Sequence, residues 1–139
     1  MWSRRNVISH ALQRRATLEA LRRPARTLNA PEACDADPLL VTSAVHHGEE
    51  SSIPCPICER DHLLNLNYTF GDQLGMYSGR IKSTEELIEM QNNVGEFTVR
   101  VVEVCPDCRW NHLIETYTLG DGKKRRRPRR EETVEDIYG

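Results

Sequence analysis

Two stretches of the chain, CPICERDHLLNLNYTFGD at residues 55–72 and CPDCRWNHLIETYTLGD at residues 105–121, carry nearly the same pattern. Each begins with Cys-Pro-x-Cys, places a histidine four residues after the second cysteine, and continues through His-Leu to a Tyr-Thr pair and Gly-Asp. The second copy is one residue shorter ahead of its Tyr-Thr pair. A chain of 139 residues has room for one compact domain with tails. We therefore interpret the repeat as two halves of one site.

The cysteines of the repeat are the predicted ligands of one structural Zn²⁺ ion: Cys55, Cys58, Cys105 and Cys108. Structural zinc is tetrahedral, and two residues between paired cysteines let one tight turn direct both thiolates at the same ion. Proline suits the first position of such a turn because it fixes φ and donates no amide. The 46 residues between the two pairs exceed the usual ribbon spacing, and further secondary structure between the pairs accounts for them. A redox CxxC motif typically opens a helix after a strand, whereas both pairs here precede strands.

The histidines leave two alternatives open. In one, His62 and His112 complete three ligands in each half, and the chain binds two metal ions. In the other, each histidine begins its strand and packs beside the turn, which we favour because four thiolates already saturate one zinc ion. Cys34 with His46 and His47 is a weaker candidate site. A single cysteine ahead of a helix is usually a small buried residue, and paired histidines at a helix C-terminus interact favourably with its dipole.

The hydrophobic pattern predicts an α+β fold: a small antiparallel zinc-ribbon-like sheet with an inserted helix, preceded by two helices. Apolar spacing indicates a first helix over 4–23. A second helix is expected between Asp37, as N-cap ahead of Pro38, and Gly48. The capping box Ser83 to Glu86 opens the inserted helix, which closes on Gly95.

Alternating residues predict three strands, in LLNLNYTF, EFTVRVVEV and HLIETYTL. In the first, Leu64, Leu66, Tyr68 and Phe70 are expected to share the buried face. EESSIP, residues 49–54, reads as a linker, and GDQLGMYSGRIK reads as an irregular loop. We therefore expect three regions: a helical N-terminal region at 1–48, a zinc-ribbon-like domain at 49–122, and a disordered tail at 123–139.

Charge is distributed unevenly along the chain, although the formal net charge is only −2. Residues 1–30 hold seven arginines and one acid, residues 31–120 hold five basic and fifteen acidic side chains, and residues 121–139 hold seven basic and five acidic ones. The basic charge of the C-terminal region lies in KKRRRPRR, Lys123 to Arg130. The sequence thus describes an acidic domain between two basic ends. No apolar run approaches the roughly 18–20 residues that a membrane-spanning helix needs.

With these motifs located, the chain resembles a family of short uncharacterised actinobacterial proteins. The resemblance rests on MWSRR, ATLEAL, CDADP, GDQLG-x-YSGRIK, YTLGDG and the two Cys-Pro-x-Cys pairs, and it covers nearly the whole length. It implies a bacterial cytoplasmic protein and no established activity. The paired turns separately resemble the knuckles of zinc ribbons in transcription and translation factors. The common knuckle has glycine after its second cysteine, where this chain places Glu59 and Arg109.

Two functions follow as hypotheses. The first is a zinc-ribbon adaptor that docks on a large cytoplasmic machine, RNA polymerase or the ribosome, with Trp110 either a contact residue or part of the ribbon packing. The second is direct RNA or DNA binding through the Arg-rich first helix and the Lys123–Arg130 tail. We expect no enzyme, because the sequence offers no nucleophile–base pair, phosphate loop or open metal site.

Overall fold

The computed structural model describes residues 3–22 and 34–120. Within them, five strands form one antiparallel sheet in the order β1-β6-β5-β3-β2, and the short strand β4 pairs with β3. The helices and strands are β1 Arg5–Ser9, α1 Ala11–Arg22, α3 Pro38–His47, β2 Glu49–Pro54, β3 His62–Phe70, the 3₁₀ helix η1 Asp72–Tyr77, β4 Arg80–Ile81, α4 Thr84–Asn93, β5 Phe97–Val104 and β6 Asn111–Leu119. The α+β fold and its inserted helix α4 are confirmed, and the predicted tail at 123–139 lies outside the described residues.

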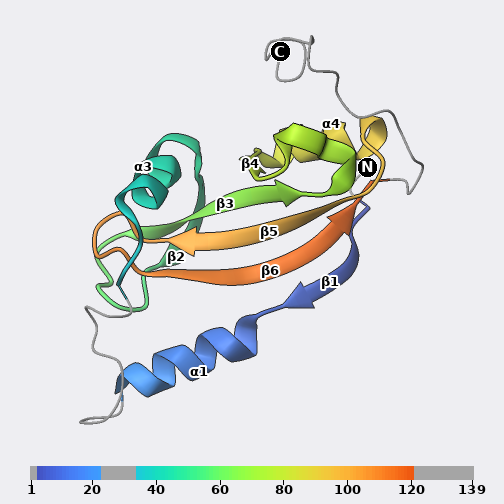
Figure 1. Cartoon of the computed structure of the whole chain (residues 1–139). Helices are drawn as coiled ribbons and strands as arrows, with labels where there is room; N and C mark the ends of the chain where they lie inside the picture. Colours follow the sequence, from blue (N-terminus) through green and yellow to red (C-terminus); the bar gives the residue numbers. More distant parts are fainter. Residues whose placement is uncertain (1–2, 23–33, 121–139) are drawn as a thin grey trace.

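The two repeats contribute β3 and β6, and these strands flank β5 on either side. Both are antiparallel to β5, so the two halves of the repeat are joined through a strand that belongs to neither (Figure 1). Strand β6 carries an extra residue where its register with β5 shifts between Val101 and Val102. The Cys-Pro-x-Cys turns consequently lie at the same end of the sheet, one before β3 and one after β5.

Helices cover both faces of this sheet. Residues of α3 pack on Leu64, Leu66, Val102 and Val104. The opposite face bears the cluster of Phe97, Val99, Val101, Tyr117 and Leu119 with residues of α4 and η1. α3 lies near the end of the sheet that carries the two turns, and α4 lies near the other end (Figure 1). None of the described helices is both long and apolar enough to cross a membrane.

The first predicted helix, 4–23, is wrong over its first residues. Arg5–Ser9 form strand β1, which pairs with β6 and covers what would otherwise be an open sheet edge. The helix begins only at Ala11, whose N–H donates to the Ser9 hydroxyl. The β-branched pair Val7 and Ile8 suits a strand. Strand pairing with a distant part of the chain therefore overrides the helical spacing of these residues.

The predicted linker EESSIP is also wrong, because Glu49–Pro54 form the edge strand β2 beside β3. Its residues are mostly exposed and show no apolar alternation, so the usual strand signal is missing. Within the predicted loop 71–82, the structure places η1 and the two-residue strand β4.

Strand β3 is confirmed, but its predicted buried face is wrong in part: Leu66 is fully buried whereas Phe70 is exposed, and Asn67 and Thr69 on the opposite face are buried. Asn67 donates to the carboxylate of Glu49 and to the carbonyl of Lys82, and Thr69 donates to the carbonyl of Arg80. These buried side chains bind the neighbouring segments by hydrogen bonds, which is how buried polar groups are normally accommodated.

Candidate metal centre

The four predicted ligands meet at the turn-bearing end of the sheet. The Sγ atoms of Cys55, Cys58, Cys105 and Cys108 all lie within 4.8 Å of one another. The Sγ–Sγ distance is 3.6 Å from Cys55 to Cys108 and 3.7 Å from Cys58 to Cys105. A tetrahedron with zinc–sulfur bonds of about 2.3 Å has sulfur–sulfur edges of about 3.8 Å. The spacing of these sulfurs therefore fits a tetrahedral metal ion.

Each pair sits in a tight turn, and we call residues 55–62 the first knuckle and residues 105–112 the second knuckle. In the first, Glu59 N donates to the Cys55 carbonyl and Ile57 N donates to the Cys55 sulfur. In the second, Arg109 N donates to the Cys105 carbonyl and Cys108 N donates to the Cys105 sulfur. The two turns thus share the backbone hydrogen bond, but the amide that donates to the first cysteine's sulfur comes from a different position in each turn. In each turn the first cysteine is the more buried.

The residue after the second cysteine adopts a left-handed conformation in both knuckles. Glu59 has φ 58° and Arg109 has φ 72°. This backbone region favours glycine, because a Cβ atom there approaches the neighbouring carbonyl. The knuckle backbone is therefore the usual one, although the sequence lacks the usual glycine.

The four thiols differ in their readiness to ionise. Burial raises the pKa of Cys55 and of Cys105, and it raises the pKa of Cys108 to about 12. Burial acts in the same direction on Cys58, but hydrogen bonds from the Arg60 backbone and the neighbouring thiols lower its pKa to about 7. A cation that binds here must displace protons, as thiolate metal sites generally require.

The histidines of the repeat have other partners. His62 Nδ1 lies 3.1 Å from a Glu50 carboxylate oxygen. His112 Nδ1 lies 2.6 Å from the Leu113 carbonyl oxygen, and its ring stacks on Trp110 with centroids 5.8 Å apart. Neither histidine belongs to the group of four sulfurs. Their positions agree with the alternative in which neither binds the metal: His112 packs beside its knuckle, and His62 lies at the surface.

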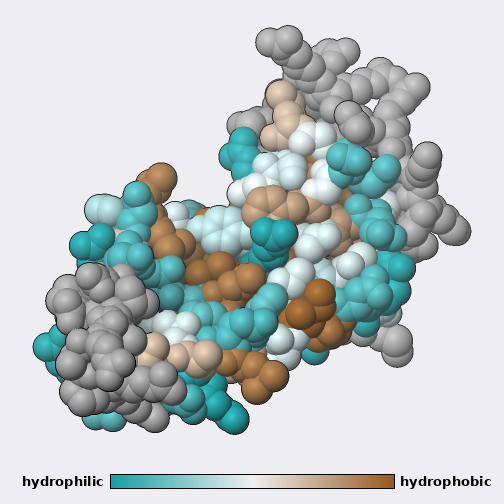
Figure 2. Space-filling view, turned by 60° about the horizontal axis from the view of Figure 1, so that its bottom comes forward, coloured by the Kyte–Doolittle hydropathy of each residue, from teal (hydrophilic) through white to brown (hydrophobic). Residues whose placement is uncertain are grey.

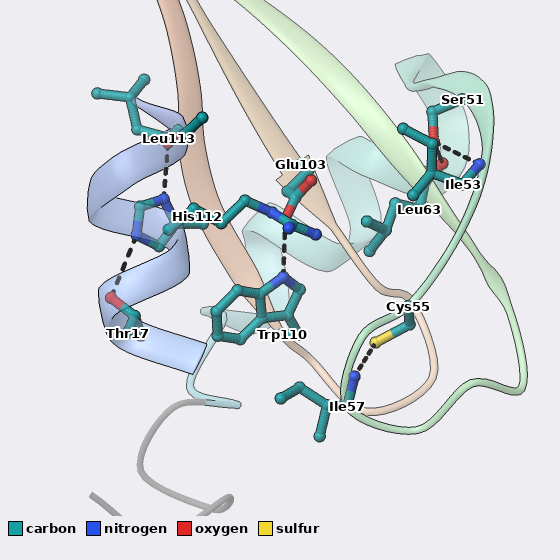
Figure 3. Close-up of polar contacts among 12 residues, drawn as sticks. Thr17, Ser51, Ile53, Cys55, Ile57, Leu63, Glu103, Trp110, His112 and Leu113 are labelled. Carbon is teal, nitrogen blue, oxygen red and sulfur yellow. Dashed lines mark hydrogen bonds and ion pairs between the residues drawn. The ribbon is translucent and has the colours of Figure 1, made fainter. Parts of the chain in front are cut away.

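Trp110 is a packing residue of the second knuckle. Its side chain is 1% exposed, and its indole N–H donates to the buried carboxylate of Glu103 at 2.9 Å (Figure 3). Arg14 of α1 donates to the same carboxylate oxygen at 2.6 Å. Leu18 and Leu21 of α1 pack against the cluster that contains Trp110, Cys55 and Cys105. Helix α1 is thereby attached to the end of the sheet that holds the four sulfurs.

Sequence reasoning missed the role of Glu103. It lies in the predicted strand EFTVRVVEV, where its alternation with Val99 and Val101 places it on the buried face. The sequence does contain a signal for this role: an acidic residue stands at a position of the strand that the alternation predicts to be buried. Such a residue requires a charged or hydrogen-bonding partner.

Cys34 also lies at this end of the molecule, half-buried, with its Sγ 3.7 Å from the Sγ of Cys108. It is not a member of the group of four sulfurs. His46 and His47 occupy the last turn of α3. Within the described residues, Cys34 forms no three-ligand group with these histidines.

The comparisons with known proteins agree with the resemblance drawn from the sequence. The model of a Family of unknown function (DUF5318) matches residues 1–133. "Uncharacterized protein Rv0049" of Mycobacterium tuberculosis and "Uncharacterized protein Mb0050" of Mycobacterium bovis are each 45% identical to the chain over 98 residues, which cover 70% of this chain and 72% of theirs. No solved structure matches the chain. The family match spans nearly the whole chain, and the chain belongs to this family of unknown function, DUF5318.

Proposed function

We propose that the protein is a non-catalytic adaptor held in shape by one structural zinc ion, and that it docks in the cytoplasm on a large machine such as RNA polymerase or the ribosome. The observation that carries the proposal is the closed group of four sulfurs, all within 4.8 Å of one another. Four protein ligands fill a tetrahedral site, whereas catalytic zinc sites keep a position open for water or substrate. A centre of this kind supports a fold and presents its surface to a partner.

Zinc is the ion that this ligand set favours. Thiolates are soft ligands, and a tetrahedral group of four sulfurs is typical of zinc or of iron–sulfur centres. Two Cys-x-x-Cys turns, each leading toward a strand, form the usual zinc knuckle, and the amide-to-sulfur hydrogen bonds of both turns fit that arrangement.

The surface offers several apolar contacts for a partner. Viewed from the side of β1 and α1, brown apolar residues stand in separate groups among teal hydrophilic ones (Figure 2). Val7 and Ile8 of β1 and Leu12 of α1 are 47%, 54% and 74% exposed. Because Trp110 is buried, these exposed side chains are better candidates for partner contact than the tryptophan is.

Nucleic-acid binding through the N-terminal arginines has less support. Arg4 pairs with Glu115 at 2.6 Å, Arg5 with Glu96 at 3.5 Å, and Arg14 with Glu103 at 2.6 Å. An arginine already paired with a carboxylate must break that contact before it can neutralise a phosphate. The exposed Arg15 of α1 and the Lys123–Arg130 tail, which lies outside the described residues, remain as candidates for RNA or DNA contact.

The metal is tested first. We expect elemental analysis of the reduced protein to give one zinc per chain. Cys58→Ser and Cys105→Ser should lose the zinc and unfold both knuckles, because small metal centres supply much of the folding free energy of their domain. Cys34→Ser is the matched control and should keep one zinc. Two zinc ions per chain would contradict the four-sulfur site, and a metal-free reduced protein would contradict the zinc proposal.

The partner is tested by purifying the tagged protein from its own cytoplasm, with and without nuclease, followed by mass spectrometry. We expect polymerase or ribosomal proteins to remain bound to a variant that lacks residues 123–139. The zinc-free Cys58→Ser protein is the control and should lose them. If nuclease removes all bound material, or if the truncation abolishes binding, the tail would be the functional element and the adaptor proposal would be wrong.

A further inference from the structure

A fifth sulfur lies in contact with the metal centre without belonging to it. Cys34 Sγ is 3.7 Å from Cys108 Sγ, as close as the paired sulfurs of the metal site are to each other. Cys34 nevertheless lies outside the group of four. It is half-buried, so it retains some contact with solvent. Because four thiolates fill a tetrahedral site, Cys34 remains a free thiol when the metal is bound.

Dedicated contacts hold Cys34 in this position. Ala36 N donates to the Arg109 carbonyl at 3.1 Å, and Arg109 Nε donates back to the Ala36 carbonyl at 2.7 Å. Asn111 donates from its side-chain amide to the Asp35 carboxylate at 3.0 Å. Ala36 itself is buried. The two residues after Cys34 are therefore tied to the second knuckle, and they fix the Cys34 thiol beside Cys108.

The geometry points to a reaction between these two sulfurs. A disulfide bond is about 2.05 Å long, so the sulfurs need to approach by less than about 2 Å from their present positions. Cys34, which is not a ligand, is free to react while the centre is loaded.

We propose that Cys34 and Cys108 are a disulfide-forming pair oxidised by hydroperoxides, and that the reaction removes one of the four metal ligands. The proposal rests on the four-thiolate metal site of the proposed function. In the first step the Cys34 thiol gives up its proton and its sulfur attacks hydrogen peroxide, the O–O bond breaks, the leaving hydroxide takes up the proton, and the products are Cys34 sulfenic acid and water. In the second step the Cys108 thiolate attacks the Cys34 sulfur, the S–S bond forms, the S–O bond breaks, and hydroxide leaves.

The balance for hydrogen peroxide is one thiol, one thiolate and one peroxide giving one disulfide, one water and one hydroxide. The two sulfurs together lose two electrons, and the peroxide gains them. The metal is left with three thiolates. A three-thiolate site binds the ion more weakly and has an open position for water. Peroxide would thus convert a closed structural centre into one that releases its ion.

The test uses full-length protein loaded with zinc and treated with equimolar hydrogen peroxide. A zinc-binding dye follows release of the ion, and alkylation with mass spectrometry maps the disulfides. We expect a Cys34–Cys108 disulfide to form together with zinc release, and we expect release to be at least about tenfold slower in Cys34→Ser. A dithiol reductant with added zinc should restore the loaded form.

Two further variants test whether the reaction depends on the position in which Cys34 is held. Arg109→Ala removes the side-chain contact to Ala36 and should slow disulfide formation while the zinc content stays at one. Arg15→Ala, at an exposed position of α1, should react like the parent protein. Equal release rates in the parent and Cys34→Ser, or a disulfide confined to the four ligands, would overturn the proposal. If the unoxidised protein binds no zinc at all, the proposed function fails instead.

Discussion

At the scale of single residues, both knuckles adopt a left-handed backbone conformation without the glycine that usually occupies it. Glu59 and Arg109 occupy the left-handed position that glycine usually fills. A non-glycine residue in such a conformation costs on the order of 1 kcal/mol or more. Arg109 offsets this cost, because its side chain binds the Ala36 carbonyl. Glu59 is exposed, and its side chain makes no hydrogen bond or ion pair among the described residues.

Glycine substitutions at these two positions should therefore have different effects on stability. Glu59→Gly relieves backbone strain and should raise the free energy of unfolding by about 0.5–1 kcal/mol. Arg109→Gly relieves similar strain but removes the contact to Ala36, so it should give no gain or a loss. Chemical denaturation of the zinc-loaded variants measures both. A destabilised Glu59→Gly protein would show that the Glu59 side chain has a stabilising role.

The thiol pKa values predict that metal binding depends steeply on pH. At pH 7 the raised pKa values keep Cys55, Cys105 and Cys108 protonated in the metal-free protein, and Cys58, with a pKa of about 7, is about half ionised. Four thiolates bind the ion, so loading should release about three to four protons. Protons compete with the metal, and the affinity should therefore rise with pH.

This release can be measured by adding zinc to weakly buffered protein with a pH indicator. Cys34→Ser is the matched control and should release the same number of protons, because Cys34 is outside the ligand group. Release of fewer than about two protons would contradict a site built from four thiolates.

At the scale of elements, the attachment of α1 to the sheet depends on one buried carboxylate. Glu103 is 3% exposed and accepts hydrogen bonds from Arg14 and Trp110. A buried carboxylate that loses its cationic partner remains as an uncompensated charge, which typically costs about 3 kcal/mol or more. This contact joins α1 to β5 and to the second knuckle.

Arg14→Ala should therefore lower the free energy of unfolding by about 3 kcal/mol. Arg15→Ala, on the exposed side of the same helix, is the control and should change it by less than about 0.5 kcal/mol. Urea denaturation of the zinc-loaded proteins compares the two. Similar small effects of both substitutions would mean that α1 is not attached through Glu103.

The elements that the sequence predicted are those whose signals are local. The cap at Asp37 and the capping box from Ser83 to Glu86 are both present. The four cysteines were found for the same reason, because each turn contains its own pair. Strand β1 was missed because its pairing partner β6 lies at the other end of the described chain, and strand β2 was missed because its residues are largely exposed and show no apolar alternation. Cys34 contacts Cys108, which is 74 positions away in the sequence, and no local sequence pattern predicts a contact of that kind.

At the scale of the whole molecule, the sheet has two ends with different sources of stability. One end holds the cluster of Cys55, Leu63, Cys105 and Trp110 at the candidate metal centre. The other end holds an apolar cluster with α4 in which Leu87, Val99 and Leu119 are fully buried. Strand β5 runs through both, from Phe97 in the apolar cluster to Cys105 just beyond its end. Removal of the metal should therefore destabilise the knuckle end of β5 more than the end that begins at Phe97.

We expect chelation to raise amide hydrogen exchange in the knuckles, 55–62 and 105–112, and in α1 by about a hundredfold or more, because local opening there no longer has to break metal bonds. Amides of β5 from Phe97 to Val101 should change by less than about tenfold, because apolar burial holds them without the ion. Hydrogen exchange with mass spectrometry of the loaded and chelated protein makes the comparison, and Cys58→Ser should reproduce the chelated pattern. A uniform loss of protection would instead mean that the sheet folds as one unit around the ion. In that case the proposed contact surface at β1 and the packing of the apolar end would both be lost with the metal.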